Sequence, residues 1–149
     1  MISSKKWLIL AALFAACQQP THEEEATTAG SEKIATELFI YFNDHNWNKM
    51  SELYKNPATF LDPSFGTEPV EQTRVHIAAK YAEMQKMFPD IRDSVVSIYA
   101  SGNHVTIEFI SSGTGKDGKK FMLPITSVLT VENGQISEDH TYYDNSGNL

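Results

Sequence analysis

The sequence is short of cysteine, of positive charge and of long hydrophobic runs, and each shortage excludes a class of protein. One cysteine, Cys17, allows neither an internal disulfide nor a cysteine-based zinc site. Twelve lysine and arginine residues face nineteen aspartate and glutamate residues without a basic cluster, so we expect no nucleic acid as a partner. The longest apolar run, at residues 7–16, is too short to span a bilayer as a mature helix.

What is present has the composition of one globular domain. The chain has 149 residues, of which 41% are hydrophobic, and a formal charge of −7. Its histidines show no His-x-His or His-Glu-x-x-His spacing, so we expect no metal site. The glycine-rich segment 113–118 lies between two predicted strands and opens no helix, which excludes a phosphate-binding loop. We therefore predict no cofactor.

The N-terminal segment has the plan of an export signal. Lys5 and Lys6 precede the apolar run, which ends in Leu-Phe-Ala-Ala immediately before Cys17 and resembles a bacterial lipobox. The resemblance implies a signal peptide at residues 1–16, a lipid on Cys17 and a protein anchored in the bacterial cell envelope after export. An ordinary secretory signal with an incidental cysteine is the alternative. Residues 17–30 are polar and acidic, and we expect them to form the lipidated cysteine and a flexible tether.

The remaining domain, residues 31–149, reads as helices followed by strands. Helical spacing and end signals predict helices at 31–46, 47–54 and 68–88, the last ended by Pro89. Asn133-Gly134 and the Asp-Gly pair before it are strong hairpin signals between β-rich runs. The predicted strands cover residues 58–62, 91–100, 104–112, 120–131 and 135–143. This order predicts the α+β class.

The predicted strand 120–131 carries apolar residues on both faces. One face has Phe121, Leu123, Ile125 and Leu129, and the other has Met122 and Val128. Helices can cover only one face of so small a sheet, so we expect the other face to meet a second copy in a homodimer. Counting from the following turn suggests Leu129 as an outward position.

Three strings and their order resemble the nuclear transport factor 2-like superfamily, and within it the SnoaL-like and ketosteroid isomerase branch. They are YKNPATFLDP at 54–63, MFPDIR at 87–92, and ENGQI at 132–136 running into YYD at 142–144. The resemblance covers essentially residues 31–145. It implies a cone-shaped α+β barrel in which N-terminal helices pack on a strongly curved, mainly antiparallel sheet around an apolar pocket. Because this superfamily hosts many activities, the fold alone does not give a function.

Asp62 is the leading catalytic candidate. It ends a predicted strand in an Asp-Pro step between Phe60 and Phe65, a string similar to the general-base site of ketosteroid isomerases. We expect Asp62 to line an apolar pocket that raises its pKa above the usual value of about 4. The alternative is turn chemistry, in which the carboxylate accepts hydrogen bonds from nearby backbone N–H groups.

The partner groups of those enzymes are missing from this chain. In ungapped matches, the oxyanion-binding tyrosine and acid of ketosteroid isomerases fall on Leu38 and Thr126, which disfavours steroid isomerisation by that mechanism. The acid on the last strand of SnoaL-like cyclases and epoxide hydrolases falls on Thr141. Asp139 shares the predicted face of Thr141 and is a tentative catalytic replacement, or else a solvated surface aspartate.

These observations predict a pocket that binds a small apolar organic molecule, with its reaction unassigned. The expected lining residues are Tyr54, Phe60, Phe65, Thr126, Thr141 and Tyr143. One alternative is an enzyme of the isomerase or cyclase type that uses Asp62 as general acid or base. A second alternative is a non-catalytic interaction module of the cell envelope, which a pocket filled by aromatic side chains would favour.

The lipid anchor has a direct test. Replacing Cys17 with serine removes the sulfur that accepts the lipid, so Cys17→Ser should move the protein from the membrane fraction to the soluble fraction. Fractionation followed by mass spectrometry of the N-terminus checks this. A variant that stays membrane-bound and uncleaved, at its usual size, contradicts the lipoprotein interpretation.

Overall fold

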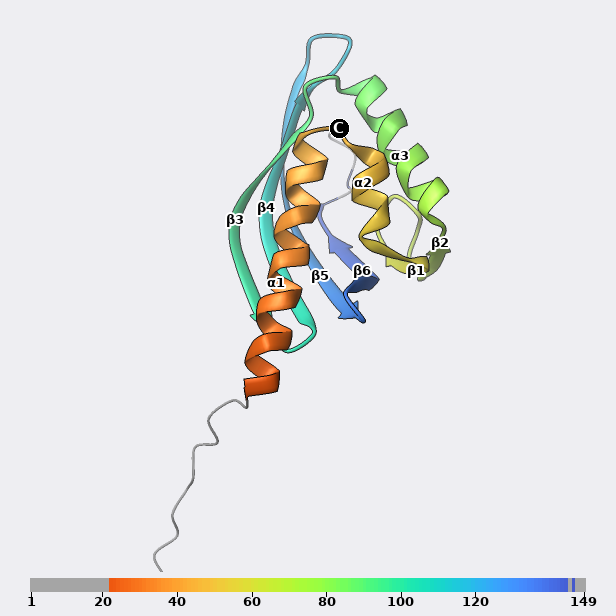
Figure 1. The fold of residues 1–149 in the computed structure, drawn as a ribbon. Helices are drawn as coiled ribbons and strands as arrows, with labels where there is room; N and C mark the ends of the chain where they lie inside the picture. The colour runs from red at the N-terminus through yellow and green to blue at the C-terminus, as the bar shows by residue number, and fades with distance from the viewer. Residues whose placement is uncertain (1–21, 145, 147–149) are drawn as a thin grey trace, which may run out of the picture.

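The computed structural model describes residues 22–144 and 146 and packs helices on one curved sheet (Figure 1). The elements are α1 (His22–Asn43), α2 (Trp47–Glu52), β1 (Tyr54–Leu61), β2 (Val70–Gln72), α3 (Arg74–Met87), β3 (Arg92–Ser101), β4 (His104–Thr114), β5 (Lys120–Glu132) and β6 (Gln135–Tyr142). The strand order is β2-β1-β6-β5-β4-β3, in which β1 and β6 run parallel and the other neighbours run antiparallel. This arrangement confirms the predicted α+β cone.

The first helix starts earlier than the sequence predicted. Residues 22–30 were expected in a flexible tether, but α1 begins at His22. The Thr28 hydroxyl accepts a hydrogen bond from the Gly102 amide at 2.8 Å, which ties this part of α1 to the β3–β4 turn. Glutamate and alanine, common between residues 23 and 29, are good helix formers, so a polar composition did not mean an irregular chain here. Cys17 and the predicted signal peptide lie outside the described residues.

The third helix starts later than predicted because a short strand precedes it. Val70–Gln72 pairs antiparallel with β1 as β2, and α3 then begins with Thr73 as its cap, whose side chain accepts from the His76 amide at 3.3 Å. At the other end, the helix stops at Met87, just before Phe88 and Pro89, as expected from the proline. No described helix is both long and apolar enough to cross a membrane.

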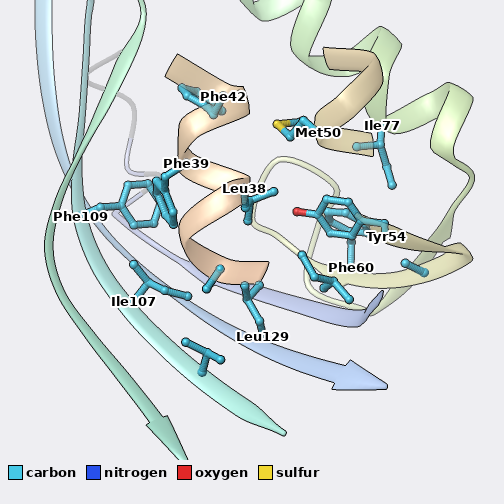
Figure 2. Close-up of a cluster of buried hydrophobic side chains, with 14 of the residues drawn as sticks. Leu38, Phe39, Phe42, Met50, Tyr54, Phe60, Ile77, Ile107, Phe109 and Leu129 are labelled. Carbon is cyan, nitrogen blue, oxygen red and sulfur yellow. The ribbon is translucent and has the colours of Figure 1, made fainter. Parts of the chain in front are cut away.

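The core lies between α1 and the concave face of the sheet. Leu38, Phe39 and Phe42 of α1 are buried, and the rings of Phe39 and Phe109 meet edge to face with centroids 4.8 Å apart (Figure 2). Each such buried side chain stabilises the fold by about 1.5–3 kcal/mol relative to an exposed one. This packing fixes which face of the sheet points inward.

The expected outward position of Leu129 is therefore wrong. Leu129 is fully buried against the helices and stands opposite Val105 and Asp139 in the sheet. The turn determines which residues of β5 share a face, but not which face the helices cover. The outward residues of β5 are the even-numbered ones, among them Met122, whose exposed fraction is 74%.

Candidate functional site

A cavity of about 440 Å³ lies between the helices and the concave face of the sheet. One part is polar and contains the carboxyl groups of both sequence-predicted catalytic candidates, Asp62 and Asp139. The other part is apolar and includes Phe88 and Phe121, whose rings meet edge to face at 4.8 Å. A Cβ atom on Gly113 would come within 2.9 Å of the Phe121 ring, so glycine lets this aromatic pair close on the strand.

The parallel pairing of β1 and β6 brings the two carboxyl groups together. Phe60 stands beside Asp139 and Leu61 beside His140, so Asp62, the next residue after β1, falls level with Thr141. The chain positions are far apart, but the register places both acids at one edge of the cavity.

A bulge in β6 turns Asp139 inward. The partner of Val131 is Ile136 and the partner of Thr130 is Glu138, which leaves Ser137 as an extra residue. After this bulge the odd-numbered residues of β6 face the cavity. Asp139 is 5% exposed, so the alternative of a solvated surface aspartate is wrong.

Asp62 is held in its ionised form by its neighbours. Its Oδ2 accepts from Lys80 Nζ at 2.7 Å, and its Oδ1 accepts from the Ser64 amide at 2.7 Å and from the Tyr143 hydroxyl at 3.0 Å. Burial opposes the charge, but the Lys80 ammonium and these hydrogen bonds outweigh it, and the pKa of Asp62 is lowered. The predicted rise in this pKa is therefore wrong, because the sequence analysis did not include Lys80.

The surroundings of Asp139 shift its pKa in the opposite direction. Its Oδ2 accepts from the Tyr54 hydroxyl at 2.7 Å and its Oδ1 accepts from the Thr141 hydroxyl at 3.0 Å. Burial without a directly bound cation raises the pKa of Asp139, and the charge of Asp62 adds to the rise, although the hydroxyl groups partly oppose it. The cavity thus holds two carboxyl groups whose pKa values are shifted in opposite directions.

Hydroxyl groups surround the two acids. Ser127 and Thr141 share a hydrogen bond of 2.7 Å, which extends the contacts of Asp139 across to β5. Burial and the nearby charge of Asp62 raise the pKa of Tyr143 to about 12, so this phenol stays protonated and donates to Asp62. The Tyr81 hydroxyl, also at the cavity, forms no hydrogen bond with any residue that the structure describes.

Five of the eight predicted site residues of the domain line the cavity, and three do not. Tyr54, Asp62, Asp139, Thr141 and Tyr143 line it.

Phe60 and Phe65 belong to the core packing and do not line the cavity. Their rings lie 6.3 Å apart, and Phe60 also packs on the Tyr54 ring at 5.1 Å. Thr126 faces the opposite side of the sheet, because it stands beside Glu108 and Tyr142 in the outward row.

Sequence reasoning missed Lys80 and Ser127 as cavity residues. Lys80 sits on a helix whose exposed positions also carry charge, so its spacing gave no signal that it reaches back to Asp62. Ser127 was one residue from the position that the ungapped match selected, and a shift of one residue moves a side chain to the other face of a strand. Within the described part of the chain, no group of three or more His, Cys, Asp or Glu residues is placed to hold a metal ion.

Comparison with known proteins agrees with this architecture. The model of the SnoaL-like domain family matches residues 35–139, and the chain therefore belongs to that family. A search of curated proteins found no match.

Several solved structures share the fold at low identity. A hypothetical protein of ketosteroid isomerase-like fold from Catenulispora acidiphila, in complex with trimethylamine, is 24% identical with a TM-score of 0.68, over 76% of this chain and 87% of that one. A protein from Jannaschia that is described as a candidate SnoaL-like polyketide cyclase is 17% identical with a TM-score of 0.69, over 85% of this chain and 91% of that one. The epoxide hydrolase/cyclase-like enzyme SalBIII, which has a role in pyran ring formation in the polyether salinomycin, is 16% identical with a TM-score of 0.69. The match covers 79% of this chain and 93% of that one. At these identities the likeness shows the fold.

The Asp62 network predicts a pH-dependent contribution to stability. Because the folded-state pKa is lowered, the contribution is present above the unfolded-state pKa of about 4 and is lost as the pH falls through the folded-state value. Asp62→Asn should therefore lower the free energy of unfolding at pH 7 by about 1–3 kcal/mol. The difference from the wild type should shrink at acidic pH, where the wild-type carboxyl is also neutral.

Urea unfolding at several pH values measures this effect. Asp117→Asn is the matched control, because Asp117 forms an exposed ion pair with Lys119 and should change stability by at most about 0.5 kcal/mol. An Asp62→Asn variant as stable as the wild type at pH 7 would show that the Lys80 contact contributes nothing.

Proposed function

We propose that this chain binds a small, largely apolar organic molecule in its cavity and transfers a proton at a carbon next to a carbonyl group. The observation that carries the proposal is the pair of carboxyl groups in one cavity whose pKa values shift in opposite directions. Such a pair divides the roles of base and acid between two residues of the same type.

Asp62 is the base in this proposal. A carboxylate has about four acceptor positions, and three of those on Asp62 are occupied by Lys80, Ser64 and Tyr143. The remaining position can take a proton from a substrate carbon held at the cavity. Because Lys80 lowers the basicity of Asp62, the substrate C–H must be acidified by its neighbouring carbonyl.

Asp139 and Tyr81 supply the stabilisation that this carbonyl needs. When the C–H proton moves to Asp62, negative charge develops on the carbonyl oxygen. A neutral Asp139 can donate a hydrogen bond to that oxygen, and Tyr81 offers a second hydroxyl with no other described partner. In a substrate with a C=C bond next to the acidic carbon, return of the proton from Asp62 to the far carbon of that double bond completes an isomerisation. In a substrate with a second carbonyl group, the enolate carbon attacks that carbonyl carbon, its C=O π bond opens, and its oxygen takes the proton from Asp62, which gives a ring.

The named relatives support this class of chemistry. A candidate polyketide cyclase and an epoxide hydrolase/cyclase-like enzyme share the fold. The likeness to a protein in complex with trimethylamine supports the other candidate, a domain that binds a small organic molecule without turnover. The carboxyl pair favours the enzyme, since binding alone does not require two acids whose pKa values shift in opposite directions.

Exchange of carbonyl-adjacent protons tests the proposal without knowledge of the natural substrate. The probe is cyclohexanone in deuterated water, with loss of the α-proton signal followed by NMR. General acid–base catalysis contributes about 10²–10⁴-fold, so Asp62→Asn and Asp139→Asn should each slow protein-dependent exchange at least 100-fold. The rate should also fall at low pH, where Asp62 becomes protonated, and at high pH, where Asp139 ionises.

Binding of the same ketone, measured by chemical shift changes, separates the outcomes. Asp117→Asn should exchange protons like the wild type. Binding without protein-dependent exchange would oppose the enzyme and favour the non-catalytic binder. No binding by the wild type would oppose both.

We also propose that the domain is exported and held in the bacterial cell envelope by a lipid on Cys17. The basic start, the short apolar run and the position of the cysteine support this anchor. The enzyme or binder would then act at a membrane surface, where apolar molecules concentrate.

We propose in addition a homodimer through the convex face of the sheet. Tyr99, Met122 and Tyr142 lie on this face with exposed fractions of 62%, 74% and 51%. Large apolar side chains on one exposed face are typical of an interface between subunits.

A charge on that face should separate the subunits. For the chain from residue 22 onward, light scattering at micromolar concentration should give a dimer mass, and Met122→Glu should give a monomer with an unchanged circular dichroism spectrum, because a buried unpaired charge is costly. Lys119→Glu, on the exposed β4–β5 turn, is the control and should remain dimeric. A monomeric wild type would refute this assembly.

A further inference from the structure

A third carboxyl group, that of Asp93, is buried under α1 and has no role in the proposed proton transfer. Asp93 lies on β3, is 8% exposed, and its Oδ1 has no hydrogen-bond partner among the described residues. The Asn43 side chain holds its backbone, accepting from the Asp93 amide and donating to the Asp93 carbonyl, both at 2.9 Å. This double contact keeps the carboxyl under the helix.

Among the residues that the structure describes, no cationic side chain forms an ion pair with this carboxyl. Its cross-strand partner Ser111 and its α1 neighbour Asn43 are uncharged. The ring nitrogens of His45 are occupied by the Ile91 carbonyl and the Gln85 amide, both at 2.8 Å.

On α3, the titratable group whose pKa is raised by burial and also by the charge of Asp93 is Tyr81. Burial raises the pKa of Asp93 to about 7, although a hydrogen bond from Ser111 acts in the opposite direction.

Ser111 connects Asp93 to the cavity. It stands directly opposite Asp93 in the sheet and lines the cavity wall. Because the two residues face each other across β3 and β4, the Ser111 hydroxyl can donate to the Asp93 carboxylate while the lone pairs of its oxygen remain free to accept. Asp93 thereby directs the Ser111 proton away from the cavity, so that the Ser111 oxygen acts as an acceptor toward a ligand.

This hydroxyl is distant from the two acids described above. Leu123 stands beside Ser111 and Leu129 beside Asp139. The two leucines are six positions apart on β5, which is about 20 Å measured along the curved strand. Apolar side chains line the cavity between them, Phe109 and Ile125 included. The cavity therefore has a polar group at each end of an apolar middle.

We propose that Ser111, oriented by Asp93, forms a second polar subsite that accepts a hydrogen bond from an N–H or O–H group at the far end of the ligand. The inference rests on the proposed binding of a small organic molecule and adds to it a specificity element. The ligand class is an apolar molecule with a carbonyl at one end and an amine or hydroxyl group at the other. Asp93 is a positioning residue, and Ser111 makes the contact.

Three probes of similar shape test the subsite. Benzylamine and benzyl alcohol carry a donor on the same ring, whereas benzaldehyde carries only an acceptor. NMR titration of the wild type at pH 8.5 should give at least tenfold tighter binding of a donor probe than of benzaldehyde, with shift changes at Leu123 and Ser111. Benzylamine against benzyl alcohol tells whether the donor is a cation.

The variants separate a positioning role from a structural one. Ser111→Ala and Asp93→Asn should each weaken donor binding about tenfold and leave benzaldehyde binding unchanged, while Ser112→Ala, the outward neighbour on β4, should change neither. For the wild type the preference for donors should decline as the pH falls below 7, and for Asp93→Asn it should not depend on pH.

Each contrary result has its own meaning. Donor binding that is equal in the wild type and Ser111→Ala overturns the subsite and leaves the proposed proton transfer intact. Failure of every probe to enter the cavity overturns the subsite together with ligand binding. If Asp139→Asn loses ketone exchange but still binds the donor probes, the result would support two independent polar sites, one at each end of the cavity.

Discussion

The parallel pairing of β1 with β6 is the constraint on which the rest of the site depends. It joins the N-terminal half of the chain, with its helices, to the last strand of the meander. Without this pairing β1 and β2 would be separated from the other four strands, and Asp62 would no longer stand beside the hydroxyl groups of β6. A long-range contact of this kind costs loop-closure entropy, which the buried side chains of α1 and the sheet offset.

The same pairing explains why two aspartates in one cavity differ. Asp62 lies at the end of its strand, where the following loop supplies a backbone amide and α3 supplies Lys80. Asp139 lies inside its strand, where the backbone is already paired, and its hydrogen-bond partners among the described side chains are the hydroxyl groups of Tyr54 and Thr141. Position along a strand thus decides whether a carboxyl meets a cation, and the pKa shifts follow from that.

Much of the fold could be predicted from the sequence, because hydrophobic spacing and turn residues are local signals. Asn133-Gly134 and Pro89 marked their turn and helix end correctly. The start of α1, the existence of β2 and the inward direction of Leu129 were not predicted. They depend on which elements pack together, and local patterns carry no such information.

The site was predictable only where a residue and its strand were both identified. Asp62 and Asp139 were found, but the charge state of Asp62 was not, since Lys80 lies 18 residues further along the chain on another element. The bulge at Ser137 and the inward direction of Ser127 are shifts of one residue, which single-sequence patterns do not resolve.

The early start of α1 has a consequence for where the domain would sit. Five residues take the chain from Cys17 to His22, a span of about 18 Å at most when fully extended. A domain held by a lipid at Cys17 would stay close to the bilayer. The β3–β4 turn, bonded to Thr28, lies at the same end of the fold as the start of α1 (Figure 1). Such a short link limits the rotation of the domain as well as its distance, so the domain would present a restricted set of orientations to the bilayer.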